Sequence, residues 1–172
     1  MRRALRPATR ILALDLHPQR YGYAVLETPA ELLDWGVKRR RRKENPRGGA
    51  SLRKGLRSLL DMWQPSLVVI KELSKHRTAR MRKLLAGVVG KVRHCRIPVR
   101  CLSQCTILRA FGNQSHTTKY ATASVLLQHF PFLASALPSP RRAWESEHYR
   151  MSMFAAVALA LAASGQSLTT TH

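Results

Sequence analysis

Residues 10–16 read RILALDL and residues 21–27 read YGYAVLE, and these two stretches decide the fold of the chain. Each is an apolar run of strand length, and the short HPQR link between them predicts a β-hairpin. Asp15 has apolar residues on both sides, which places its carboxylate at the end of a buried strand. A charge there is costly unless it is paired, and a metal ion is one such partner. Asp15 is therefore the first candidate functional residue.

The charge of the chain is strongly positive. It has 30 Lys and Arg against 9 Asp and Glu among 172 residues, a formal net charge of +21. A field of this size attracts phosphate polymers. A membrane surface is the other polyanion to consider, but no long basic amphipathic helix stands out, and the apolar run at residues 153–163 is too short to cross a bilayer. We therefore expect nucleic acid, and no membrane, as the partner.

The sequence also predicts one folded domain in a cytoplasmic protein. Cys95, Cys101 and Cys105 lack the close pair of a zinc site, and their odd number predicts reduced, mostly buried thiols. The N-terminus is basic but has no apolar segment of a secretory signal. We expect a basic N-terminal extension at residues 1–9, a single domain at 10–164 and a polar tail at 165–172.

The spacing of apolar residues predicts an α/β fold with a mixed sheet. Three strands joined by short turns come first and form an antiparallel meander, and helices then alternate with strands. The run LVVI at residues 67–70 is typical of a strand buried on both faces. The expected strands are 10–16, 20–27, 31–38, 67–70 and 98–102, and the expected helices are 51–63, 78–92, 104–111, 118–130 and 145–163.

Several segments, in their order and spacing, carry a resemblance to a known family. They are ILALD at 11–15, GYAV at 22–25, PSLVVIKE at 65–72, WESEHYRM at 144–151 and FAAVALA at 154–160. Over roughly residues 10–163 the chain resembles the RuvC-like, Holliday-junction-resolvase-like branch of the RNase H-like superfamily. The resemblance implies a mixed five-stranded sheet whose first three strands are antiparallel, with helices on both faces.

The same resemblance implies a chemistry and a set of site residues. Enzymes of this family act as dimers and cut branched DNA. They use carboxylates from the first strand, the fourth strand and the last helix to hold two divalent ions, Mg²⁺ or Mn²⁺, which clamp the attacking and leaving oxygens. In this chain the corresponding catalytic candidates are Asp15, Glu72 and Glu147, with Asp15 and Glu72 as metal ligands.

The acidic cluster departs from the family pattern. Lys71 stands directly after the apolar run of the fourth strand, where the family has an acid, and Glu72 follows one residue late. Strand side chains alternate faces, so this shift turns the carboxylate away unless a bulge restores it. In the last helix, Ser152 and Ala155 occupy the places of the family's acids. His17 stands where a small residue is common after the first acid.

Two hypotheses follow. In the first, Asp15, Glu72 and Glu147 still gather a metal and the protein is a structure-selective endonuclease. In the second, the metal centre is lost, Lys71 pairs with Asp15 in place of the cation, and the protein binds nucleic acid without a cofactor. Lys71 favours the second hypothesis. A third possibility, a structural subunit of a nucleoprotein assembly, would also bind nucleic acid. Each acid also has a simpler interpretation. Asp15 could cap a turn, Glu72 could be a solvated residue at a strand end, and Glu147 could lie in the first turn of a helix, where the helix dipole favours acids.

The basic residues are the candidate nucleic-acid contacts. They follow elements whose ends flank Asp15 in this fold, and contacts of this kind position a duplex on its phosphates without reading bases. Because no base-reading motif is visible, we expect recognition of the shape of branched or duplex DNA. Trp35, Trp63 and Trp144 are expected to pack at the core. The candidate contacts are Lys38, Arg39, Arg40, Arg41, Arg42, Lys43, Arg53, Lys75, Arg77 and Arg80.

Overall fold

A computed structural model describes residues 9–40, 50–74, 78–111, 118–142 and 144–165. Its five strands form one sheet in the order β3-β2-β1-β4-β5. β1, β2 and β3 pair antiparallel, whereas β4 and β5 continue the sheet in parallel with β1, which confirms the predicted mixed sheet. The strands are β1 Arg10–His17, β2 Arg20–Glu27, β3 Glu31–Arg39, β4 Leu67–Lys71 and β5 Val99–Leu102.

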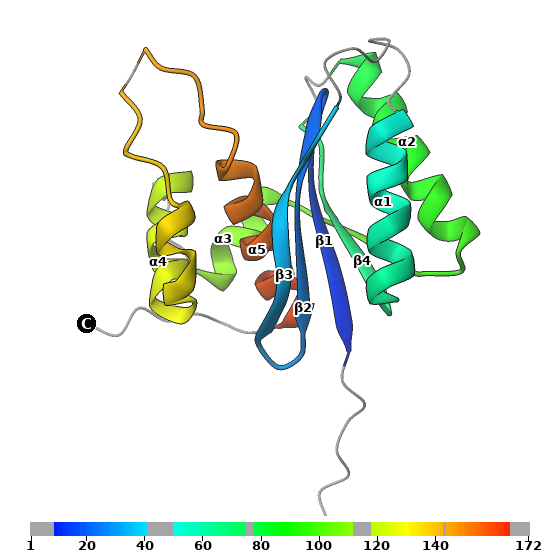
Figure 1. Cartoon of the computed structure of the whole chain (residues 1–172), viewed down its shortest axis with the longest axis horizontal. Helices are drawn as coiled ribbons and strands as arrows, with labels where there is room; N and C mark the ends of the chain where they lie inside the picture. Colours follow the sequence, from blue (N-terminus) through cyan, green and yellow to red (C-terminus); the bar gives the residue numbers. More distant parts are fainter. Residues whose placement is uncertain (1–8, 41–49, 75–77, 112–117, 143, 166–172) are drawn as a thin grey trace, which may run out of the picture.

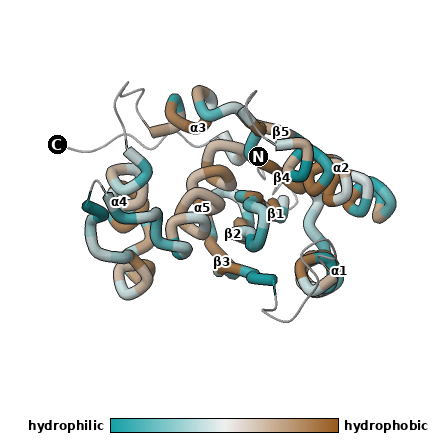
Figure 2. Tube along the Cα trace, turned by 90° about the horizontal axis from the view of Figure 1, so that it is seen from above, coloured by the Kyte–Doolittle hydropathy of each residue, from teal (hydrophilic) through white to brown (hydrophobic). Residues whose placement is uncertain are grey.

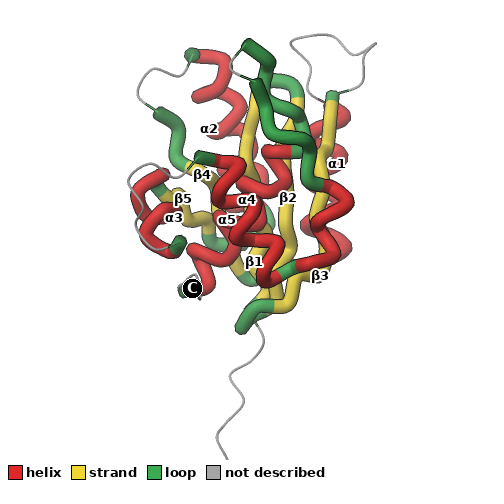
Figure 3. The backbone as a smooth tube through the Cα atoms, turned by 90° about the vertical axis from the view of Figure 1, so that its left-hand side faces the viewer, coloured by secondary structure: helices red, strands yellow, loops and turns green. Residues whose placement is uncertain are grey.

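Helices cover both faces of the sheet (Figure 1). One face carries α1 and α2, and the other carries α3, α4 and α5, with α4 and α5 in front of the strands in Figure 3. None of the described helices is long and apolar enough to cross a membrane. The helices are α1 Ala50–Trp63, α2 Ala79–His94, α3 Gln104–Ala110, α4 Lys119–His129, the 3-10 helix η1 Pro131–Ala136, and α5 Met151–Ser164.

The sheet separates two apolar cores. On one side α5 is buried almost all round and lies between the sheet and α4 (Figure 2), so its sequence is apolar on every face. On the other side α1 presents leucines at helical spacing, Leu52, Leu56, Leu59 and Leu60, to the strands. β1 supplies both cores because its side chains alternate between the two faces.

Two expectations about local structure were wrong. The last helix begins at Met151 rather than at residue 145, because residues 144–150 are exposed or half-buried and offer no apolar face to pack on the sheet. The three cysteines are free but exposed rather than buried, and Cys101 lies on β5, an edge strand of the sheet. The residues expected to form the N-terminal extension and the polar tail fall almost entirely outside the described ranges.

The first turn of α5 lies directly against β2 at Gly22. A Cβ atom at this position would overlap the backbone carbonyl of Ser152. Gly22 is also the residue that pairs with Asp15 across the first two strands. The absence of a side chain at Gly22 therefore lets the start of α5 come down beside the buried carboxylate.

We expect Gly22→Ala to lower the free energy of unfolding by about 1–3 kcal/mol, because an overpacked contact forces the α5 backbone away from the sheet. The matched control is Gly90→Ala in α2, where a Cβ meets no described atom within 4 Å. That change should be neutral or stabilise the protein by up to about 1 kcal/mol, since alanine favours helix over glycine. Equal destabilisation by both changes in urea unfolding would contradict the close contact.

Candidate functional site

Asp15 and His17 form a hydrogen-bonded pair at the end of β1. Asp15 is only 6% exposed, and its Oδ2 lies 2.8 Å from His17 Nε2. The two residues are two positions apart on one strand, so they project from the same face, which is the face that α5 covers. The imidazole N–H donates to the carboxylate and thereby offsets part of the cost of burying it.

Lys71 lies beside Asp15 on the neighbouring strand. β1 and β4 pair in parallel register up to Leu14 and Ile70, and one further step of that register aligns Asp15 with Lys71. Adjacent strands are about 4.8 Å apart. Lys71 lines a small cavity of about 30 Å³ together with Ala155 of α5 and Lys119 of α4. Two lysines therefore converge on the face where the resemblance predicts acids.

The start of α5 supplies no carboxylate to this place. Ser152 is buried, and its hydroxyl donates to the backbone oxygen of Tyr149 at 2.8 Å. Ala155 has no polar side chain. Within the described residues, no group of three His, Cys, Asp or Glu side chains is placed to hold a metal ion. Because a pair of Mg²⁺ ions needs several converging oxygen ligands, the residues present here do not fit the two-metal centre that the resemblance implies.

The structure does not bring Glu72 to Asp15. The backbone N–H of Glu72 donates to Leu102 O at 2.9 Å and continues the β4–β5 ladder past Lys71. Alternation then puts the Glu72 side chain on the opposite face from Asp15, on the side of α1 and α2. Burial, and after it the charge of Glu72, raises the pKa of the Cys101 thiol, which places the carboxylate near Cys101. No hydrogen bond or ion pair joins Glu72 to Asp15 among the described residues, where the carboxylate of Asp15 is paired with His17.

Glu147 lies outside the last helix and serves a contact of its own. Both of its carboxylate oxygens lie 2.8 Å from Lys119 Nζ. Glu147 was expected within the last helix, and this expectation was wrong, because α5 begins only at Met151. The partly exposed pair joins α4 to the segment before α5, and such pairs contribute about 0.2–1 kcal/mol.

The described basic candidates divide between the two faces of the sheet: Arg39 lies on the α5 side, and Lys38, Arg40, Arg53 and Arg80 lie on the side of α1 and α2. Lys38 lies over the Tyr23 ring at 5.4 Å and Arg39 over the Tyr149 ring at 4.8 Å. Three others line a groove between α1 and α2: Arg40, Arg53 and Arg80. The remaining candidates, Arg41, Arg42, Lys43, Lys75 and Arg77, lie outside the described residues.

Arg20, which lies in a row of residues beside Asp15, escaped the sequence prediction. The cross-strand register aligns His17 with Arg20 and Arg20 with Arg39, all at the same end of the sheet. Arg20 Nε is buried and has no hydrogen-bond partner among the described atoms. The hairpin register would have revealed Arg20, because residues opposite one another share a face. Tyr149 gave no such signal, since its place depends on where α5 begins.

The turn before α5 also carries exposed aromatic rings. Trp144 is 79% exposed, which corrects the expectation that it packs at the core, and Arg142 lies over its ring at 5.8 Å. The rings of His148 and Tyr149 lie 4.6 Å apart. Together with Arg39, these side chains form a surface of cations and ring faces next to the end of β1. We name Arg20, Arg39, His148 and Tyr149 the strand-end surface.

The fold is similar to those of solved Holliday junction resolvases. Thermus thermophilus RuvC has a TM-score of 0.65 and 17% identity, with 90% of this chain and 92% of that chain covered. The yeast mitochondrial resolvase Ydc2 has a TM-score of 0.63 and 12% identity, with coverages of 94% and 80%. The fowlpox virus resolvase in complex with Holliday junction DNA has a TM-score of 0.56 and 11% identity, with coverages of 91% and 97%. No protein-family model and no curated protein sequence matches the chain.

We expect His17→Ala to lower the free energy of unfolding by about 1.5–3 kcal/mol, because it removes a hydrogen bond to a buried carboxylate. His129→Ala, at an exposed position at the end of α4, is the matched control and should change stability by no more than about 0.5 kcal/mol. Urea unfolding of both variants provides the comparison. Similar small effects would show that His17 does not support Asp15.

Proposed function

The chain has a RuvC-like RNase H fold, and we propose that it uses this fold to bind nucleic acid by its shape without cutting it. The observation that carries the proposal is the alignment of Lys71 with Asp15 on the face that α5 covers. Branched or duplex DNA is the proposed partner, and no divalent metal is part of the proposed site.

The chemistry of a lysine explains why binding would survive and cleavage would not. An ammonium group supplies positive charge next to Asp15 and so substitutes for part of the electrostatic role of a metal ion. It has no open coordination positions, so it cannot lower the pKa of a bound water or hold the attacking and leaving oxygens together. A phosphate that reaches this end of the sheet would be attracted but not hydrolysed.

The strand-end surface supports the binding part of the proposal. Arg20 and Arg39 provide guanidinium groups, which suit phosphate oxygens, and the exposed ring of His148 offers a face against which a base or sugar can pack. The described residues of this surface form no set that reads base edges, so the proposed recognition is of shape. The net charge of +21 adds a long-range attraction that falls with salt.

The solved structures that are similar to this chain indicate which class of nucleic acid to propose as its partner. Thermus thermophilus RuvC and the fowlpox virus resolvase are each described in complex with Holliday junction DNA. We propose the same class of branched DNA for this chain, and a homodimer as the species that binds it, because two-fold junctions present two equivalent halves.

The test is a binding and cleavage experiment with a four-way DNA junction, a linear duplex and an RNA duplex, each with Mg²⁺ or Mn²⁺. We expect the junction to be bound and left intact, with affinity falling steeply as salt rises. Arg39→Ala should reduce the log–log salt slope by about 1. Arg57→Ala, on α1 and paired with Asp61, is the control that should leave junction affinity nearly unchanged.

Specific results would overturn or contradict this proposal. Cleavage of the junction that disappears in Asp15→Asn and persists in Lys71→Ala would overturn the proposal and establish a metal-dependent nuclease. Affinity confined to one base sequence, or insensitive to salt, would contradict recognition of phosphates and shape.

A further inference from the structure

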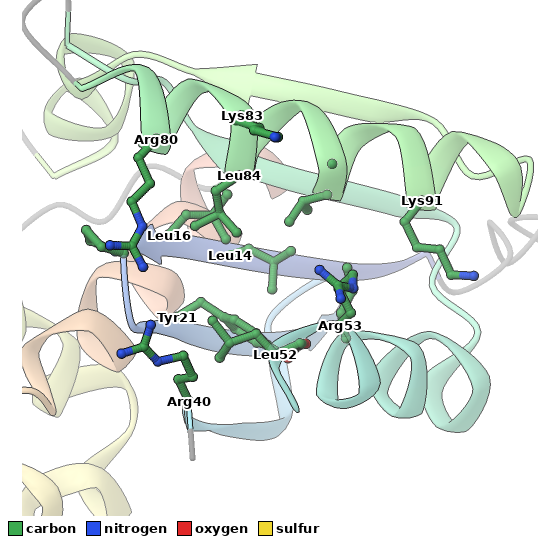
Figure 4. Close-up of a pocket in the computed structure, with 14 residues that line it drawn as sticks. Leu14, Leu16, Tyr21, Arg40, Leu52, Arg53, Arg80, Lys83, Leu84 and Lys91 are labelled. Carbon is green, nitrogen blue, oxygen red and sulfur yellow. Dashed lines mark hydrogen bonds between the residues drawn. The ribbon is translucent and has the colours of Figure 1, made fainter. Parts of the chain in front are cut away.

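A groove runs between α1 and α2 over the outer face of β1 (Figure 4). The two helices pack on different parts of the sheet, α1 against β2 and β3 and α2 against β5, and a groove remains between them, although Leu14 and Leu16 of β1 beneath it are almost fully buried. The resulting cavity has a volume of about 270 Å³. Its floor is apolar and comprises Leu14, Leu16, Tyr21, Leu52, Leu84 and Val88.

Basic side chains surround this floor. Figure 4 shows Arg80 and Arg40 near one end, Lys91 near the other, and Arg53 reaching from α1 between the two helices. Lys83 of α2 also belongs to the lining. The cations supplied by α2 alone, from Arg80 to Lys91, span about 16 Å of helix. We name the apolar floor and these five cations the α1–α2 groove.

We propose that the α1–α2 groove docks an acidic amphipathic helix of a protein partner. Such a helix has an apolar stripe for the leucine floor and acidic residues on both flanks for the surrounding cations, and helices commonly bind by laying an apolar face into a groove. We choose this partner because cations along the whole length of the groove would face its acidic residues. The proposal is independent of the nucleic-acid function, which rests on the other face of the sheet.

Other occupants fit these features less well. An anionic lipid carries its charge at one end, whereas the groove has cations at both ends and from both helices. A nucleic acid would match the cations but would leave the aliphatic floor unused, because bases stack on exposed aromatic rings and Tyr21, the aromatic residue of the floor, is only 4% exposed. A second copy docked on this groove would bring basic residues against the basic residues of the groove, so the proposed homodimer would form through another face.

Gly87 provides a direct way to test the groove. It lines the groove from α2, and a Cβ there would meet no described atom within 4 Å. Gly87→Glu therefore introduces an acid into the groove without a clash and strengthens the helix propensity of α2. Gly90→Glu is the matched control: it makes the same change on the same helix, also in open space, at a position outside the groove lining.

The probe is a fluorescent peptide of leucine, glutamate and alanine, about 16 residues long, with leucines on one helical face and glutamates on both flanks. A peptide of the same composition in scrambled order is its control. Fluorescence anisotropy at about 0.15 M salt, where surface charges are screened beyond about 8 Å, measures both. We expect the amphipathic peptide to bind at least about tenfold more tightly than the scrambled one. Gly87→Glu should weaken its binding about tenfold and Gly90→Glu less than about twofold, because only the first charge faces the peptide.

Three results would overturn the proposal. Equal binding of both peptides, or equal weakening by both variants, would mean that charge alone attracts the peptide. Loss of duplex DNA affinity in Gly87→Glu but not in Gly90→Glu would assign the groove to nucleic acid. A dimer of the unaltered chain that dissociates only in Gly87→Glu would assign it to a second copy. Circular dichroism of both variants verifies that each remains folded.

Discussion

The buried carboxylate of Asp15 and its hydrogen bond to His17 are the constraint on which the site depends. The charge lies at the end of β1, beneath the first turn of α5, where water is largely excluded. A carboxylate in such a place requires a hydrogen-bond donor or a positive charge. His17 provides the donor at 2.8 Å, and Lys71 provides the positive charge on the neighbouring strand. Because Gly22 has no side chain, the first turn of α5 can cover Asp15 and its partners.

The sheet divides the molecule into two surfaces with different chemistry. On the α5 side, cations and aromatic rings lie next to a site whose residues do not fit a pair of metal ions. On the α1–α2 side, cations surround an apolar floor. The same excess of positive charge therefore suits two partners: phosphates where the neighbouring side chains are polar, and acidic apolar helices where they are aliphatic. If both proposals hold, the chain joins a nucleic acid to a protein.

Most of the fold was predictable from the sequence because its elements have strong apolar patterns. The LVVI run of β4 predicts a buried strand and the spaced leucines of α1 predict an amphipathic helix, and the structure has both. The start of α5 was not predictable. Acids at 145 and 147 imitate a helix N-terminus, but Glu145 accepts from the backbone of Arg142 and Glu147 pairs with Lys119 of α4. The contact of Glu147 with Lys119 exists only after distant elements have met, as does the small cavity that Lys119 lines together with Lys71.

Titration of Mn²⁺ followed by isothermal calorimetry tests the central claim most directly, with the unaltered chain and Lys71→Glu measured side by side. If a lysine occupies the place of the metal beside Asp15, the unaltered chain takes up no Mn²⁺ at this site, and Lys71→Glu gains saturable binding that is lost again when Asp15→Asn is added. Saturable binding by the unaltered chain that Asp15→Asn abolishes would contradict the account, because it would show that the carboxylate still holds a metal ion with Lys71 in place.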